Sequence, residues 1–208
     1  MKVEIKALSP ELEESYLDFF DHRAFSDGSP YYPCYCNAFN MSAAQIERMR
    51  DQAKRYGEGV EGWKNALRQT AAHMVREGMI QGYLAFDKGL SIGWCNANDR
   101  MNYFRVGAFD LDHIPKDHPP HDCRRKGQIK SIVCFEICPE YRGMGIAAQL
   151  LDRVCADAKE EGYAFVEAYP MEEQQTALAF TGPLRLYEKA GFAVFSQDGS
   201  TVIMRKKL

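Results

Sequence analysis

The sequence predicts a mixed α/β fold, with one main β-sheet and helices interleaved between its strands. Residues 129–138 and 164–168 are nearly continuous in apolar and β-branched residues, as strands buried on both faces of a sheet are. Between these two segments, apolar residues recur along Gly145–Glu161 with the spacing of an amphipathic helix. This order of strand, helix and strand favours helices layered on a sheet.

The size and charge of the chain exclude several classes of protein. Its 208 residues, 46% of them hydrophobic, suffice for one buried core and leave little room for two, so we expect a single domain over 1–208. A net charge of -3 and a pI of about 6.0 predict no attraction to nucleic acid or to anionic lipid. The chain has no long apolar run, and its N-terminus alternates apolar and charged residues, so we expect no membrane span, no signal peptide and a cytoplasmic location.

The N-terminal half predicts one strand and three helices. Val3–Leu8 alternates like a strand, and Ser9-Pro10-Glu11 has the residue types that begin a helix. Residues 42–77 are helical in composition, a helical insertion that glycines divide into two helices. Residues 31–39 are rich in aromatic side chains and cysteine, so we expect them to pack on the core or to line a pocket.

The C-terminal half predicts two hairpins and a long loop. Gly82–Asp87 and Leu90–Asn96 flank one short turn, and Phe192–Gln197 and Thr201–Arg205 flank another, after a short helix over Leu184–Ala190. A long loop over 107–128 is rich in proline and charge, and loops of this length are usually functional or mobile.

One turn between a strand and a helix has the features of an anion site. The turn runs Arg142-Gly143-Met144-Gly145-Ile146-Ala147, directly before the amphipathic helix. Its glycines allow a ligand to approach the backbone, and a helix N-terminus presents unsatisfied N–H groups and the positive end of its dipole. The turn lacks the Lys-Ser/Thr of a P-loop and the third glycine of the dinucleotide fingerprint. These residues alone leave two interpretations open, a phosphate site and a tight turn that binds nothing.

This turn resembles motif A of the GNAT superfamily of acetyltransferases. The family pattern Gln/Arg-x-x-Gly-x-Gly/Ala reads Arg142-x-x-Gly145-x-Ala147 here, and Leu186–Phe192 is similar to the family signature Leu-Tyr-Glu-Lys-x-Gly-Phe. The resemblance covers residues 80–208 and is closest to a bacterial branch of unassigned substrate. It implies a mixed, mostly antiparallel sheet of about seven strands, splayed at the cofactor site and covered by helices on both faces. Residues 129–208 would form the cofactor-binding core.

By this resemblance, the co-substrate is acetyl-CoA. The backbone of Ile137 and Cys138 would pair with its pantetheine arm where two strands splay apart. Family members often carry asparagine seven residues before the signature tyrosine, and Phe180 takes that place here, which puts a side-chain amide contact in doubt. The amides that would cradle the pyrophosphate belong to Arg142, Gly143, Met144, Gly145, Ile146 and Ala147.

The implied reaction is direct attack of an amine on the thioester carbonyl, with a tetrahedral oxyanion to be stabilised. Tyr187 matches the family tyrosine that often protonates the leaving thiolate, and a phenol and the CoA thiol have broadly similar proton affinities. The alternative role for Tyr187 is that of a half-buried aromatic that only packs.

Two glutamates are candidates for the general base. Glu136 and Glu167 lie in apolar strands, where an acid is unusual unless it is paired or functional. On the first strand, the bases of family members tend to lie at the positions of Val133 or Ser131. Side chains alternate between the two faces of a strand, so Glu136 is expected to point to the other face. The alternative role for Glu167 is an ion pair with a nearby Arg or Lys. Many enzymes of this type also rely on bulk water to deprotonate the amine.

Two further interpretations involve metal and thiol chemistry. The loop 107–128 holds three histidines and Cys123, but their spacing fits no usual zinc pattern, so we expect no metal. Cys34 or Cys36 as a nucleophile would indicate a hydrolase or redox enzyme, but no histidine partner is evident. Several of the seven cysteines lie in apolar runs and indicate small buried side chains in a reducing compartment.

The sequence therefore predicts an acetyl-CoA-dependent N-acetyltransferase that acts on an amine of a small molecule or a peptide. The alternative is a GNAT-like protein that binds acyl-CoA as a sensor without turnover, and the presence of Tyr187 argues against it. We expect residues 42–77 and 107–128 to build the acceptor pocket, and the acidic balance of the chain suits a cationic amine. A homodimer is common for such folds, and no residue pattern here predicts or excludes one.

Overall fold

The computed structural model describes residues 1–106, 109–110, 128–170, 180–198 and 201–208. The helices are α1 (Glu13–His22), α2 (Ala43–Ala53), α3 (Gly59–Arg76), α4 (Ile146–Glu160) and α5 (Leu184–Lys189). The strands are β1 (Glu4–Ala7), β2 (Gly82–Asp87), β3 (Leu90–Asp99), β4 (Arg105–Val106), β5 (Phe109–Asp110), β6 (Ile129–Ile137), β7 (Phe165–Ala168), β8 (Ala193–Asp198) and β9 (Thr201–Lys207). This order agrees with the prediction, except that β4 was not predicted and β5 lies inside the segment predicted as a loop.

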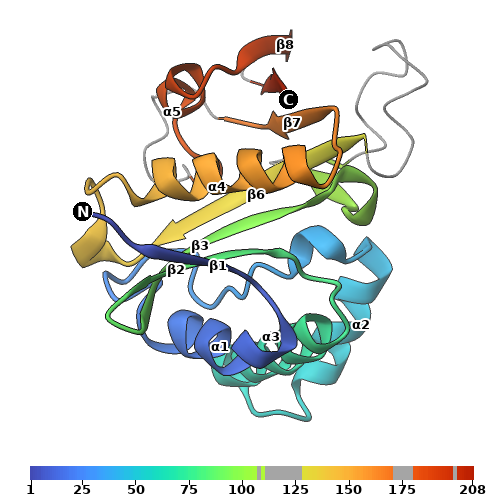
Figure 1. The fold of residues 1–208 in the computed structure, drawn as a ribbon. Helices are drawn as coiled ribbons and strands as arrows, with labels where there is room; N and C mark the ends of the chain where they lie inside the picture. Colours follow the sequence, from blue (N-terminus) through green and yellow to red (C-terminus); the bar gives the residue numbers. More distant parts are fainter. Residues whose placement is uncertain (107–108, 111–127, 171–179, 199–200) are drawn as a thin grey trace.

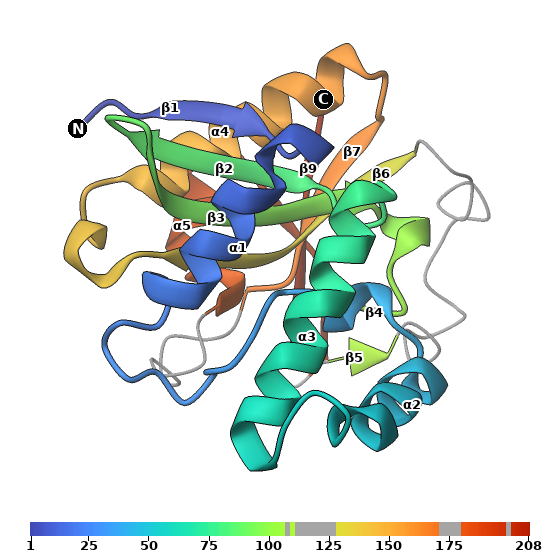
Figure 2. The same ribbon diagram turned by 90° about the horizontal axis from the view of Figure 1, so that it is seen from below.

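Seven of the described strands form one sheet in the order β1-β2-β3-β6-β7-β9-β8. Neighbouring strands are antiparallel apart from β6 and β7, which are parallel. Parallel neighbours need a crossover, and α4 provides it between the end of β6 and the start of β7. α4 covers one face of the sheet, whereas α1 packs on β3 from the other face beside α3 (Figures 1 and 2). The sheet with helices on both faces is the fold class that the sequence predicts.

The two faces of the sheet belong to one continuous core. Trp94 on β3 is fully buried, and its ring makes an edge contact of 4.9 Å with Tyr16 on α1. The same hydrophobic cluster extends from Met49 on α2 to Val154 on α4. Among the described residues, no helix combines the length and apolar character that a bilayer span requires.

The sheet opens halfway along β6. Ile129–Ile132 pair with Phe165–Ala168 of β7, whereas pairing with β3 continues as far as Ile137. β7 ends two residues before Pro170, which has no N–H for a ladder. From Val133 to Ile137, β6 therefore has only β3 as a neighbour among the described strands, and the sheet is splayed at this place.

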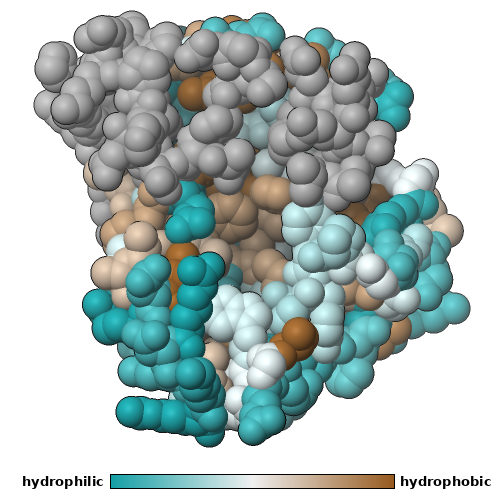
Figure 3. Space-filling view, turned by 180° about the vertical axis from the view of Figure 1, so that it is seen from behind, coloured by the Kyte–Doolittle hydropathy of each residue, from teal (hydrophilic) through white to brown (hydrophobic). Residues whose placement is uncertain are grey.

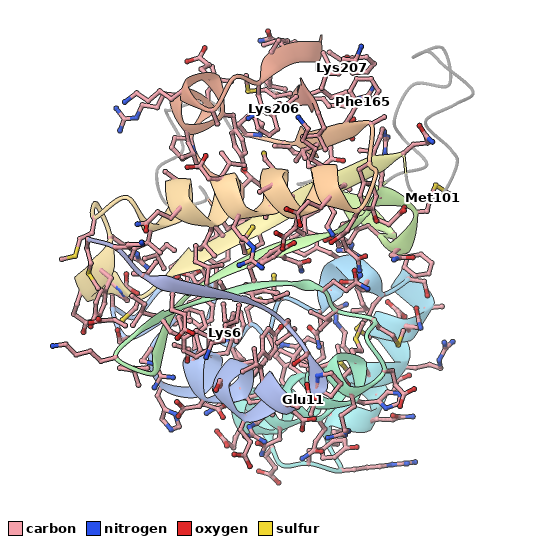
Figure 4. The ribbon with its side chains drawn as sticks, viewed as in Figure 1. Lys6, Glu11, Met101, Phe165, Lys206 and Lys207 are labelled. Atoms are coloured by element: carbon pink, nitrogen blue, oxygen red, sulfur yellow. The ribbon has the colours of Figure 1, made fainter. Side chains whose placement is uncertain are left out.

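The C-terminal hairpin takes the other side of β7. Phe165 pairs with Lys207 and Val166 with Lys206 in the β7–β9 register. Figure 4 shows Phe165 close to Lys206 and Lys207. Arg205 of β9 lies over the ring of Phe195 on β8, 3.5 Å from its centroid. This hairpin closes the sheet beyond the opening, so that the opening lies inside the sheet and not at its edge.

The single domain predicted over 1–208 can be tested by unfolding. Trp63→Phe removes the tryptophan of α3 and leaves Trp94 of β3 to report on the sheet. Because the helices and the sheet share one core, we expect Trp94 fluorescence and far-UV circular dichroism to give the same urea midpoint. An earlier transition by circular dichroism would show that the helices of 42–77 unfold independently, against a single domain.

Candidate functional site

The turn from β6 into α4 has a backbone that favours glycine. Gly143 and Gly145 have φ values of 76° and 77°, in the left-handed region. A Cβ at either position would meet no atom within 4 Å, so the requirement is conformational and the space over the turn is open. α4 begins at Ile146, one residue later than predicted. The first N–H groups of a helix have no partner within it, so those of α4 face a turn that a ligand can approach.

The side chain of Arg142 joins three segments around this turn. Its Nε donates to the carbonyl of Ile137 at 3.0 Å, its Nη1 to Asp27 Oδ2 at 2.5 Å, and its Nη2 to Glu136 Oε1 at 3.2 Å. The hydrogen bond from Arg142 holds the pKa of Asp27 below its ordinary value. Arg142 therefore ties the end of β6 to the segment that follows α1.

A cavity of about 500 Å³ lies beside Arg142. Four segments line it: the chain after α1, the end of β6, the turn with the start of α4, and the chain leading into α5. The lining residues are Asp27, Gly28, Ser29, Pro30, Tyr31, Phe135, Glu136, Ile137, Arg142, Ala147, Phe180, Gly182, Pro183 and Leu186. The cavity thus adjoins the stretch of β6 that has lost β7 as its neighbour.

The face opposite to the view of Figure 1 is hollowed. Figure 3 shows apolar side chains at the bottom of this hollow and hydrophilic side chains beside it. Concave surfaces with an apolar floor and a few polar groups are the usual form of small-ligand sites.

Glu136 is a buried acid in the lining of the cavity. Only 13% of its side chain is exposed, and burial raises its pKa to about 7 although Arg142 acts in the opposite direction. Alternation along the strand predicts that the side chains of Glu136 and Phe135 point to opposite faces of the sheet, yet both residues line the cavity. The reason is the missing neighbour strand, because a cavity at a free strand edge is bordered by both faces of the strand.

The match to a family model decides what kind of site this is. Residues 56–192 match the acetyltransferase (GNAT) family. The chain belongs to the GNAT family. The match covers most of the chain and includes both the glycine turn and the segment Leu186–Phe192.

Solved structures share the fold at low sequence identity. PaiA N-acetyltransferase from Thermoplasma acidophilum, solved in complex with coenzyme A, is 17% identical over all of both chains, with a TM-score of 0.55. A GNAT acetyltransferase from Streptococcus pneumoniae is 14% identical over 100% of this chain and 99% of that one, with a TM-score of 0.53. YncA from Salmonella typhimurium, solved with its cofactor acetyl-CoA, is 11% identical over 100% and 95%, with a TM-score of 0.51. No curated protein matches the chain in sequence.

Tyr187 of the GNAT signature segment lies behind the cavity wall. Its side chain is fully buried between Phe135 and Phe192, with ring centroids 6.4 and 5.4 Å away. Its hydroxyl donates to the carbonyl of Thr181, and burial raises its pKa well above the ordinary value. This is the packing role that the sequence left as its alternative. A role in protonating the thiolate stays a prediction and requires the bond to Thr181 to open.

Glu167 of the GNAT chain is fully buried in an ionic cluster and is not part of the cavity lining. Its carboxylate lies 3.2 Å from Arg100 Nη1 and 2.5 Å from Arg205 Nε, and it accepts from the Tyr169 hydroxyl at 2.5 Å. This is the ion-pair role that the sequence predicted as the alternative for Glu167. A role as general base stays a prediction, and these partners oppose it because they already engage both oxygens of the carboxylate.

The backbone at the end of β6 has partners within the chain. The Ile137 carbonyl accepts from Arg142, and the Cys138 N–H donates to the Ile92 carbonyl at 2.9 Å. A pantetheine contact at either of these two groups therefore requires an exchange of partners. The free part of β6 that adjoins the cavity lies at Phe135 and Glu136.

Among the lining residues that the sequence did not identify as site residues, Tyr31 and Asp27 matter most for the chemistry of the cavity. Tyr31 belongs to the aromatic segment that we expected to line a pocket, and its ring makes an edge contact of 5.5 Å with Phe180. The second is Asp27, the partner of Arg142, which is 115 positions away in sequence. No local pattern marks such a distant pair, whereas the apolar character of residues 31–39 is a signal that points to Tyr31.

The structure also bears on the thiol and metal interpretations. Burial raises the pKa of the Cys34 thiol to about 12, which opposes its use as a nucleophile. The buried Cys36 thiol accepts from Asn96 Nδ2 at 3.2 Å, and no hydrogen bond joins either thiol to a histidine of the described chain. The described residues contain no group of three or more His, Cys, Asp or Glu that could hold a metal. His113, His118, His121 and Cys123 lie outside the described residues.

The ion-pair role of Glu167 predicts a large effect on stability. Glu167→Gln removes a fully buried negative charge that two largely buried guanidinium groups share, which we expect to lower the free energy of unfolding by about 3–5 kcal/mol. Glu160→Gln, on the exposed side of α4, makes the same chemical change without a buried partner and serves as the control. Urea unfolding measures both, and equal small losses would contradict the structural role.

Proposed function

We propose that this GNAT protein transfers the acetyl group of acetyl-CoA to an amine of a small molecule or a peptide. The observation that carries the proposal is the continuity of the open glycine turn at the start of α4 with the cavity beside the unpaired part of β6. A helix N-terminus suits a pyrophosphate, and an unpaired strand edge suits the amide groups of a pantetheine arm. These are the two parts of CoA that a protein must hold in order to direct the thioester.

The turn and the strand before it would bind different parts of CoA. The amides from Arg142 to Ala147 would bind the pyrophosphate, while Ala147 also lines the cavity. The arm would then run along β6 past Ile137 toward Phe135, where Phe180 replaces the family asparagine with an apolar wall. This path brings the thioester to Glu136.

Glu136 is the proposed general base. An amine arrives protonated at neutral pH and must lose a proton before it attacks, and a carboxylate with a pKa of about 7 is suited to accept it there. Among the residues that the structure describes, Arg142 and Asp27 are the charged groups that act on the pKa of Glu136. Tyr31, Cys34, Cys36 and Cys134 are close enough to be affected by its charge. The acceptor amine would reach Glu136 past the segment that follows α1.

The cofactor site can be tested by calorimetric titration of acetyl-CoA. Gly145→Trp forces a side chain onto the left-handed turn and into the open space over it, so we expect saturable binding to be lost. Gly162→Trp is the matched control, because Gly162 also has a positive φ and open surroundings but lies after the far end of the same helix. Loss of binding in both variants would point to unfolding, and retained binding in Gly145→Trp would contradict a site on the turn.

The role of Glu136 predicts a pH dependence. The carboxylate accepts a proton only in its ionised form, so kcat/KM for acetyl transfer should rise with pH up to about 7 and then level off. Glu136→Gln should lower kcat/KM by about 10²-fold and remove this rise, whereas Glu160→Gln should leave it unchanged. The measurement is CoA release with a panel of alkyl, arylalkyl and peptide amines. A rise that persists in Glu136→Gln assigns deprotonation to bulk water, and binding without any CoA release favours the sensor alternative.

A further inference from the structure

Tyr31 has a buried hydroxyl with nothing to bind in the described chain. The residue lines the cavity, yet its hydroxyl is shielded from solvent and has no hydrogen-bond partner among the residues that the structure describes. A buried hydroxyl without a partner costs free energy, so such groups in proteins are usually satisfied by water, an ion or a ligand. Because Tyr31 lines the cavity that we propose as the substrate site, a bound ligand is the partner that we expect for its hydroxyl.

The Tyr31 hydroxyl is a hydrogen-bond donor at neutral pH. Burial raises the pKa of its phenol, and its neighbours Cys134 and Glu136 raise it further. The phenol therefore stays protonated at neutral pH and can donate a hydrogen bond to a developing negative charge. Its ring is held by the edge contact with Phe180, which limits the directions in which the hydroxyl can point.

Tyr31 and Tyr187 differ in what their hydroxyls can do. Tyr187 is the family candidate for the proton donor, but its hydroxyl is bound to Thr181 and it is not part of the cavity lining. Tyr31 lines the cavity together with Glu136, and its hydroxyl is unbound in the described chain. The geometry therefore separates a tyrosine whose hydroxyl is satisfied by the chain from a tyrosine of the cavity wall whose hydroxyl has no partner in the described chain.

We propose that Tyr31 is the catalytic residue that donates a hydrogen bond to the thioester and a proton to the leaving sulfur. This inference rests on the proposed acetyl transfer and on Glu136 as its base. It assigns both proton transfers to one wall of the cavity, formed by the segment after α1 and the end of β6.

The protons balance in this scheme. Glu136 first takes the proton of the ammonium form and passes it to solvent. Ionised again, it accepts the second proton as the nitrogen of the neutral amine forms a bond to the acetyl carbon. The C–S bond then breaks, its electron pair stays on sulfur, and the Tyr31 hydroxyl gives that sulfur its proton. The proton on Glu136 passes to the Tyr31 phenolate, which restores both side chains and leaves an amide and a CoA thiol.

Binding measurements test the contact without any acceptor. Acetyl-CoA, CoA and desulfo-CoA, which has no sulfur, are titrated into the wild type, Tyr31→Phe and Tyr187→Phe. We expect Tyr31→Phe to weaken acetyl-CoA binding by about tenfold and to leave desulfo-CoA unchanged, because the lost hydrogen bond goes to the thioester. Tyr187→Phe should bind all three ligands like the wild type. Unchanged acetyl-CoA binding in Tyr31→Phe, or the same selective loss in Tyr187→Phe, overturns the proposal.

Stability and turnover complete the test. Tyr187→Phe should lower the free energy of unfolding, because it removes a satisfied buried hydrogen bond, whereas Tyr31→Phe should not. With any amine that the wild type acetylates, Tyr31→Phe should lower kcat by about 10²-fold at saturating acetyl-CoA and abolish the solvent deuterium isotope effect on kcat. An unchanged kcat in Tyr31→Phe contradicts the role. If the folded wild type binds no acetyl-CoA, the proposed function itself fails, a result distinct from either outcome for Tyr31.

Discussion

The site depends on one constraint, which is that β6 stays paired with β3 from Lys130 to Ile137 but loses β7 after Ile132. Backbone groups inside a protein must find partners, so a strand that loses a neighbour in the middle of a sheet leaves polar groups that something else must satisfy. At Ile137 the chain uses the Arg142 side chain for this purpose. Along Phe135 and Glu136 it leaves a cavity instead. The free edge of β6 and the cavity beside it thus follow from the early end of β7, and the N-terminus of α4 adjoins them.

Electrostatics joins this opening to a part of the chain far away in sequence. Arg142 belongs to the glycine turn, but its guanidinium is shared by Glu136 on β6 and Asp27 after α1. The same contact opposes the rise in the pKa of Glu136 that burial causes, so that this pKa is about 7. One side chain therefore sets the position of a cavity wall and also the proton affinity of the acid in that wall.

Two pairs of identical residues show how position decides chemical role. Glu136 and Glu167 both lie in apolar strands, but two arginines pair with Glu167 and a tyrosine donates to it, whereas Glu136 has one arginine partner and lines a cavity. Tyr31 and Tyr187 both touch the aromatic lining, but the hydroxyl of Tyr187 is bound to Thr181, whereas that of Tyr31 has no partner in the described chain. In each pair, the residue with more partners is held within the fold, and the other is the one to which we assign a role in catalysis.

The sequence by itself determined the order of helices and strands, the glycine turn and the family, because these depend on periodicity and on residues close together in the chain. Only the tertiary structure decided that Glu136 faces the cavity, that Glu167 is paired, that Tyr187 is bound to Thr181 and that Asp27 and Tyr31 belong to the site. These properties depend on partners that are distant in sequence, such as Asp27 for Arg142 and Phe180 for Tyr31. A local pattern restricts where a side chain lies along its element, but burial and long-range contacts decide what it meets there.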